Sequence, residues 1–155
     1  GKSSIGSIIS KKLKMNFIDI DKEIEKKIGL KINKIFVERG EKYFREIEEK
    51  ITLKILEKNH IVISLGGGAF INNKIRKKVL DNHISFWLNW DVKTLIDRIE
   101  GNQKRPLAYK ASRDELNELI KKRSIIYAKA MYKINCENMT KNEIANNILK
   151  IYEAH

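Results

Sequence analysis

The sequence contains only one cysteine, Cys136, and one proline, Pro106. A single cysteine excludes an internal disulfide, and no second cysteine or histidine stands at metal-ligand spacing from it, so a cysteine-based metal site is excluded as well. No apolar run approaches the ~18 residues of a membrane-spanning helix, and no charged start followed by an apolar stretch indicates a signal peptide. These absences favour a structural cysteine in a reducing compartment, and we expect the protein to be cytoplasmic.

Acidic residues are comparatively few, with 20 Asp and Glu against 32 Lys and Arg and a formal net charge of +12. A positive excess favours anionic partners such as nucleotides, nucleic acid or an acidic membrane surface. The basic residues are nevertheless spread along the chain and interrupted by acids at helical spacing, as in EEKITLKILEK, which is typical of solvated helix faces. Charge alone therefore leaves both interpretations open.

The 155 residues, of which 42% are hydrophobic, suffice for one compact domain with a core. Helix-like periodic runs alternate with short apolar patches, as in α/β proteins. The patches predict strands at 15–20, 60–65, 84–88 and 132–136. The periodic runs predict helices up to about 13, over 22–29, 32–39, 41–58 and 91–99, before residue 84, and after the capping pairs Ser112/Glu115 and Thr140/Glu143. Residues 100–111 interrupt the pattern and contain the only proline.

The first residues, GKSSIGSII, have the residue types that end a phosphate-binding P-loop and then enter a helix. Taken alone, a helix that happens to follow a glycine explains them equally well. The first predicted strand ends in FIDID, where alternation places Asp19 and Asp21 on one face at the carboxyl edge of the sheet, where α/β proteins bind ligands. Capping of a loop is the alternative role for either aspartate.

Three consecutive glycines follow the second predicted strand, and without Cβ atoms their backbone amides can approach a ligand closely. They are Gly66, Gly67 and Gly68.

Three arginines are further candidates, each with a simple alternative. Arg45 is spaced to pair with a glutamate three or four residues later in its helix. Arg105 lies in the loop that interrupts the pattern. Arg123 lies between lysines and, taken alone, is typical of a solvated face.

Six motifs occur in a characteristic order: GKSS at 1–4, FIDID at 17–21, FREIEE at 44–49, SLGGGA at 64–69, KRPLA at 104–108 and KRSIIYAKA at 122–130. Together they resemble shikimate kinase, a small P-loop kinase of aromatic amino-acid biosynthesis. The resemblance covers the whole chain, and the combination is far more specific than any single motif.

The resemblance implies a single domain over residues 1–155 with a nucleoside-monophosphate-kinase-like α/β fold. A five-stranded parallel sheet would lie between layers of helices, with a mobile lid at about 100–113. The protein would transfer the γ-phosphate of ATP to the 3-hydroxyl of shikimate with Mg²⁺ as cofactor. We expect a monomer that binds ATP and shikimate but neither nucleic acid nor membrane.

The resemblance also implies a phosphate and metal site at the start of the chain. Gly1, Lys2, Ser3 and Ser4 would bind the nucleotide, with Lys2 on the β- and γ-phosphates. Ser3 would bind Mg²⁺, and Asp19 would support the metal through water.

On the side of the acceptor, Asp21 would bind the hydroxyl and orient it for in-line attack. Arg45 and Arg123 would clamp the substrate carboxylate, because guanidinium groups match a planar anion. The three glycines would present amides to the substrate.

The resemblance places two more arginines on the nucleotide. Arg105, on the lid, would close onto the phosphates and exclude water, and Arg98 would lie near the adenine. Many relatives carry a basic residue beside the adenine in the segment equivalent to 135–143, but no arginine occurs there in this sequence.

The downstream motifs identify GKSS as the end of a P-loop whose leading portion and preceding strand are not in the sequence. That strand would be the central one, so its two neighbours would lack a ladder partner. We expect a protein about 10–15 residues longer at this end.

Three other functions compete with this interpretation. Another small-molecule P-loop kinase, such as one that phosphorylates gluconate, would share GKSS but would not need two arginines beside the paired aspartates. A nucleic-acid-binding domain would use the positive charge, yet no recognised binding motif is present. A kinase-like fold without activity is the third.

Overall fold

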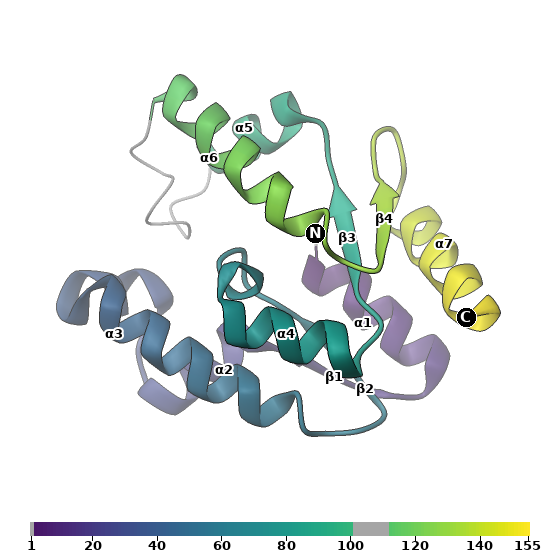
Figure 1. The fold of residues 1–155 in the computed structure, drawn as a ribbon, viewed down its shortest axis with the longest axis horizontal. Coiled ribbons are helices and arrows are strands. Elements are labelled where there is room, and N and C mark those ends of the chain that lie inside the picture. The colour runs from purple at the N-terminus through teal and green to yellow at the C-terminus, as the bar shows by residue number, and fades with distance from the viewer. Residues whose placement is uncertain (1, 101–111) are drawn as a thin grey trace.

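Four short strands form two parallel pairs in the computed structural model, which describes residues 2–100 and 112–155. β1 (Asn16–Asp19) pairs with β2 (Ile61–Ser64), and β3 (Phe86–Asn89) pairs with β4 (Tyr132–Asn135). Within the described residues no ladder joins the two pairs, which Figure 1 shows as separate sheets. All four predicted strands are confirmed, and a fifth strand between the pairs is not among the described residues.

A cavity of about 740 Å³ separates the two pairs. All four residues of β2 and all four of β3 line it, whereas no residue of β1 or β4 does. The strands that face each other across the gap are therefore β2 and β3. This agrees with the expectation that two strands in this sequence lack a ladder partner.

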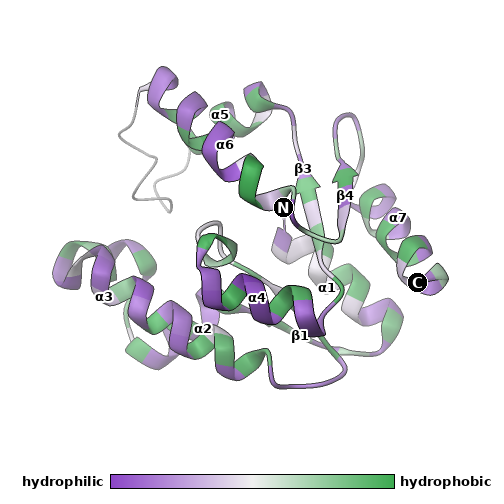
Figure 2. Ribbon diagram, in the orientation of Figure 1, coloured by the Kyte–Doolittle hydropathy of each residue, from purple (hydrophilic) through white to green (hydrophobic). Residues whose placement is uncertain are grey.

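Helices connect and cover the strands, and Figure 2 shows that each carries both hydrophilic and hydrophobic residues, as expected of helices with one buried face. They are α1 (Lys2–Leu13), α2 (Ile20–Ile28), α3 (Ile32–Ile55), α4 (Asn73–Asn82), α5 (Val92–Glu100), α6 (Arg113–Tyr127) and α7 (Lys141–Ala154), with a short 3₁₀ turn η1 (Ala69–Ile71). No helix in the described part of the chain is both long enough and apolar enough to cross a membrane.

Two of the buried clusters hold the two strand pairs in place. The first joins α1, β4 and α7, and α1 and α7 pack side by side. The second joins α2 and α3, where Phe44, Ile51 and Ile55 are buried and Ile47 packs against them, at the spacing of one helix face. The α/β fold class is thus confirmed.

Local sequence signals account for most element boundaries. Ser112 accepts a hydrogen bond from the amide of Glu115 at 3.2 Å, and Thr140 accepts one from the amide of Glu143 at 3.1 Å, so both predicted caps are confirmed. The two helices predicted on either side of Gly40 form one element with a break at this residue, whose φ is 84°. Glycine adopts this left-handed conformation without steric strain.

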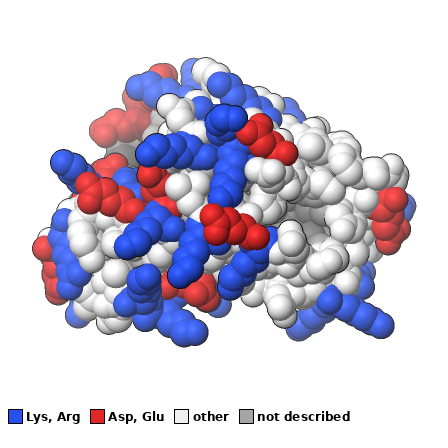
Figure 3. All heavy atoms as spheres, turned by 60° about the horizontal axis from the view of Figure 1, so that its bottom comes forward, with Lys and Arg blue, Asp and Glu red and all other residues white. Residues whose placement is uncertain are grey.

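The single cysteine and the surface charge agree with their simpler interpretations. Cys136 is fully buried, and burial raises the pKa of its thiol to about 11, so the thiol is protonated and structural. Figure 3 shows Lys and Arg side chains mixed with Asp and Glu over one part of the face in view, beside an uncharged, hollowed part. This face therefore carries mixed charge rather than one basic patch.

Candidate functional site

Most of the predicted site residues meet at the turn formed by residues 66–68, directly after β2. A Cβ on the first glycine would lie 2.8 Å from Oδ1 of Asp21, and one on the second would lie 3.1 Å from Nη1 of Arg123. A Cβ on the third would overlap the guanidinium of Arg45, lying 2.6 Å from its Cζ. Positive φ angles occur at two described glycines, and neither belongs to this turn. Glycine at these positions lets the ends of the three charged side chains approach the turn closely, and a Cβ would displace them.

We call this cluster the glycine-turn site: Asp21, Arg45, Glu48, Arg123 and residues 66–68. All of them line the large cavity between the strand pairs. Its charged side chains come from three different helices, α2, α3 and α6.

The two aspartates of FIDID take different positions from those predicted. β1 ends at Asp19, and Asp21 lies in the first turn of α2, so the shared strand face was a wrong expectation. Asp19 is the N-cap of α2 and accepts a hydrogen bond from the amide of Lys22 at 3.3 Å. Because Asp19 caps α2, the strand ends one residue before the predicted end at 20 and Asp21 falls in the helix. The two carboxylates still interact, because the charge of Asp19 contributes to the pKa of Asp21.

Asp21 carries an unusually basic carboxyl group. Burial raises its pKa, and the negative charge of Asp19 raises it further, whereas Lys2 and Arg45 act in the opposite direction. A carboxylate of this kind is a better proton acceptor than an exposed one.

Arg45 is held by a buried carboxylate. Its Nη1 donates to Oε1 of Glu48 at 2.8 Å, and the side chain of Glu48 is only 3% exposed. Burial raises the pKa of Glu48, and Arg45 opposes that shift. Of the two glutamates spaced to pair with Arg45, Glu48 is the partner, while Glu49 accepts from Asn72 at 2.6 Å. The ion pair fixes a guanidinium that also faces the glycine turn.

Arg123 lies beside the glycine turn and is half-buried, so it is not on a solvated face. Within the described residues no carboxylate lies within 4.0 Å of its guanidinium. One helical turn later, the hydroxyl of Tyr127 donates a hydrogen bond to the carbonyl of Gly67. α6 thus both supplies a cation and fixes the turn.

The start of α1 combines a cationic residue with oxygen donors. The hydroxyl of Ser3 donates to Oδ2 of Asp19, and Lys2 lies close enough to lower the pKa of Asp21. No residue of the first turn of α1 is itself acidic, and the carboxylate that lies against this helix start is that of Asp19. Lys141 donates to Oγ of Ser4 at 3.3 Å and adds a second cation.

A divalent cation would find two oxygen donors at this helix start. Ser3 supplies a hydroxyl and Asp19 a carboxylate, already in contact with each other. No cluster of three His, Cys, Asp or Glu side chains occurs among the described residues. The donor set therefore fits Mg²⁺, which retains waters and takes one or two protein carboxylates with substrate phosphates.

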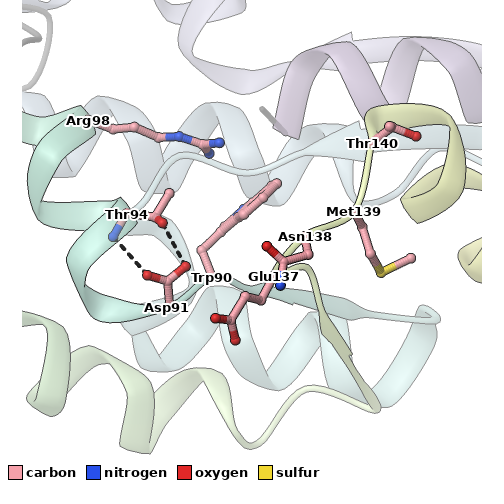
Figure 4. Close-up of a pocket in the computed structure, with 8 residues that line it drawn as sticks. All are labelled: Trp90, Asp91, Thr94, Arg98, Glu137, Asn138, Met139 and Thr140. Atoms are coloured by element: carbon pink, nitrogen blue, oxygen red, sulfur yellow. Dashed lines mark hydrogen bonds between the residues drawn. The ribbon is translucent and has the colours of Figure 1, made fainter.

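A second cavity of about 430 Å³, here called the tryptophan pocket, opens between α5 and the loop after β4 (Figure 4). It is lined by Trp90, Asp91, Thr94, Arg98, Glu137, Asn138, Met139 and Thr140. The guanidinium carbon of Arg98 lies 4.2 Å from the centroid of the Trp90 ring. Asp91 accepts two hydrogen bonds from Thr94, which lower its pKa.

Two predicted site residues, Gly1 and Arg105, lie outside the described residues, as does most of the lid predicted at 100–113. The described ends of that segment are tied together. Arg113, at the start of α6, pairs with Glu100 at 2.9 Å and with Asp97 at 3.5 Å.

Glu48 was one of the two glutamates spaced to pair with Arg45, and Tyr127 lies in the motif KRSIIYAKA, but neither was assigned a role in the site. Two further residues of these sites, Trp90 and Lys141, were not singled out in the sequence. Trp90 follows directly after the third strand, where α/β proteins place ligand contacts, and this position was its only signal. Lys141 gave no signal, because its approach to Ser4 joins the two ends of the chain.

Comparison with known proteins gives one family. The family profile described as Shikimate kinase matches residues 1–153. A shikimate kinase of Persephonella marina is 40% identical over 149 residues, which cover 96% of this chain and 90% of the relative. One of Bacillus subtilis is 36% identical over 156 residues, covering 97% and 82% respectively.

Solved structures agree with the sequence matches. Shikimate kinase from Aquifex aeolicus superposes with a TM-score of 0.89 at 32% identity, covering 99% of this chain and 90% of that one. The enzyme from Acinetobacter baumannii in complex with shikimate superposes with a TM-score of 0.93 at 28% identity, covering 99% and 87%.

Proposed function

The chain belongs to the shikimate kinase family of ATP-dependent small-molecule kinases, and we propose that it transfers the γ-phosphate of ATP to the 3-hydroxyl of shikimate. The products are ADP and shikimate 3-phosphate. The observation that carries the proposal is the convergence of Asp21, Arg45 and Arg123 on the glycine turn. A carboxylate and two guanidinium groups in one cavity suit a substrate that has both a hydroxyl and a carboxylate.

Two arginines bind the carboxylate of shikimate in this proposal. Arg45 is held by its ion pair with Glu48. Arg123 forms no ion pair within 4.0 Å in the described part of the chain, although its charge acts to lower the pKa of Glu48. Its guanidinium can therefore donate to the substrate carboxylate. Each charge-assisted hydrogen bond of this kind contributes about 1.5–3 kcal/mol.

Asp21 orients the accepting hydroxyl and takes its proton. The hydroxyl oxygen attacks the γ-phosphorus in line, the bond from that phosphorus to the β–γ bridging oxygen breaks, and ADP leaves with the electron pair. The proton of the hydroxyl passes to the carboxylate of Asp21, whose raised pKa favours the transfer. The glycines of the turn let the substrate approach backbone amides, since no Cβ stands in the way.

The start of α1 binds the phosphates. Lys2 and the helix N-terminus attract them, and Ser3 with Asp19 would hold Mg²⁺, with Asp19 acting through water. The bound ion supplies neutralisation of the phosphate charge. Ser4 and Lys141 lie beside the same helix start and add polar contacts to the nucleotide.

The tryptophan pocket binds the base of the nucleotide, with Arg98 beside the adenine. The guanidinium lies over the ring of Trp90, and this cationic and aromatic pair suits a planar heteroaromatic ligand. Gly1 and Arg105 complete the phosphate site in the family pattern, and their roles stay predictions from the sequence.

A coupled assay of ADP release tests the reaction. With ATP and Mg²⁺ present, ADP should form when shikimate is added and not when gluconate is added at the same concentration. Removal of Mg²⁺ with a chelator should abolish the signal. Equal activity on gluconate, or none on shikimate, would overturn the assignment.

A further inference from the structure

The second cavity contains an aromatic side chain to which the reaction assigns no role, Trp90. We propose that its indole is a positioning surface for Arg98: it holds the guanidinium flat at the wall of the tryptophan pocket, so that the base of a nucleotide stacks on an arginine already in place. This rests on the proposed function, because it concerns how the same nucleotide site is prepared.

The contact between the two side chains is the closest of its kind in the described residues. Arg98 Cζ lies 4.2 Å from the Trp90 centroid, whereas the other three cation–π contacts measure 5.1 or 5.2 Å. Figure 4 shows the Arg98 side chain reaching from α5 towards the indole. At this distance the guanidinium contacts the ring face directly.

No ion pair among the described residues holds Arg98 in place. Within the described residues no carboxylate lies within 4.0 Å of its guanidinium, although Asp91 and Glu137 line the same pocket. Asp91 is instead engaged by the two hydrogen bonds from Thr94. Asp91 and Cys136 are close enough to feel the charge of Arg98, but the ring of Trp90 is the group in direct contact with its guanidinium among the described residues.

The position of the pair gives this contact a function beyond packing. Trp90 and Arg98 are the only residues that line both the tryptophan pocket and the large cavity, as far as the described residues show. They form the wall between the tryptophan pocket and the gap that separates β2 from β3. An arginine free to swing would leave this wall incomplete, and a ligand would have to order it on binding.

Loss of the indole should weaken nucleotide binding alone. Trp90→Leu should raise the dissociation constant of ATP about three- to tenfold, the range expected from a cation–π contact at a partly exposed site. The dissociation constant of shikimate should stay within about twofold, because its site lies on the other side of the wall. Trp90→Phe keeps an aromatic face and should recover part of the ATP affinity.

Calorimetric titration of the full chain with ATP and, separately, with shikimate measures both constants without relying on fluorescence. Trp87→Leu is the matched control, since it removes an indole from β3 with its own cation–π contact to Lys133 at 5.1 Å but does not line the tryptophan pocket. It should leave the ATP constant unchanged. In an Arg98→Ala background, Trp90→Leu should have no further effect on ATP, because the side chain it positions is absent.

Each result decides a separate point. Unchanged ATP affinity in Trp90→Leu overturns the positioning role, and so does an additive loss in the double variant. Equal weakening of ATP and shikimate assigns Trp90 to general packing, which also overturns it. If the unaltered chain binds shikimate but not ATP, the nucleotide site of the proposed function fails as well.

Discussion

Arg45 in the glycine-turn site is fixed by a carboxylate that is 3% exposed, whereas Arg98 in the tryptophan pocket is fixed by an aromatic ring. The first arrangement places two carboxyl groups and two guanidinium groups close together in a buried cavity and raises the pKa of both Asp21 and Glu48. The second has an arginine without an ion pair among the described residues. Charged side chains are therefore concentrated in the glycine-turn site, where phosphoryl transfer is proposed. A neutral aromatic ring lies in the tryptophan pocket, where the base of the nucleotide is proposed to bind.

Because one arginine is held by a buried carboxylate and the other by an aromatic ring, the two sites should differ in their sensitivity to mutation. A buried charge loses much when its partner is removed, because the remaining charge has no water to replace it. An exposed arginine on a half-buried ring, such as Arg98 on Trp90, loses less, because water remains available. We therefore expect substitutions of charged residues in the glycine-turn site to change turnover or substrate binding about ten- to a hundredfold more than substitutions in the tryptophan pocket. Each factor of ten corresponds to about 1.4 kcal/mol.

The largest effect is expected from Asp21→Asn. Removing the proton acceptor should lower turnover about 10²- to 10⁴-fold while shikimate still binds. Steady-state kinetics with each substrate varied in turn measures this. Asp114→Asn, on an exposed position of α6, is the control and should leave turnover unchanged. If the turnover of Asp21→Asn stays within a few-fold of normal, the proton acceptor is another residue. The glycine-turn site would then not be the place where the chemistry occurs.

A smaller effect, on binding, is expected from Arg123→Ala. Loss of a charge-assisted contact of about 1.5–3 kcal/mol should raise the Michaelis constant for shikimate by about one to two powers of ten. The constant for ATP should change little. Lys122→Ala, its exposed neighbour in α6, should change neither. The prediction fails if the shikimate constant stays unmoved, or if the ATP constant rises equally.

Tyr127→Phe should have a weaker effect, because it removes one hydrogen bond that fixes the glycine turn. We expect a loss of about 1 kcal/mol in the free energy of unfolding, measured by denaturant titration. Tyr43→Phe is a matched control, since its hydroxyl accepts from Arg39 at 2.8 Å on the exposed surface. If both variants lose the same free energy of unfolding, the hydrogen bond from Tyr127 to Gly67 stabilises the fold no more than an exposed one does.

The smallest change is a stability difference that depends on pH. The pKa of Asp21 is raised in the folded state above its ordinary value near 3.8, so ionisation of Asp21 opposes folding. Asp21→Asn should therefore unfold at a higher temperature than the unaltered chain at pH 7. The difference should shrink as the pH falls towards 3.8 and vanish below it, where the carboxyl is protonated in both states. Melting curves across that range test the sign, and a variant less stable at pH 7 would contradict it.

The sequence predicted correctly those structural features that depend on a single short segment. The four strands and the caps at Ser112 and Thr140 were all predicted, because each depends on residues close together in the sequence. The pairing of Arg45 with a glutamate was open between two positions. Burial then selected Glu48, which points into the core, over Glu49.

Sequence by itself determined the family, the order of the elements and the residue types at the site, since motif order and hydrophobic period are properties of the chain alone. Only the tertiary structure decided which side chains meet. Asp21 moved from the strand to the first turn of α2, Tyr127 reached the carbonyl of Gly67, and Arg98 came to rest on Trp90. The physical reason is that the cavity and the helices around it form only when distant segments pack, so no local pattern records which atoms will fill the space above a glycine or the face of a ring.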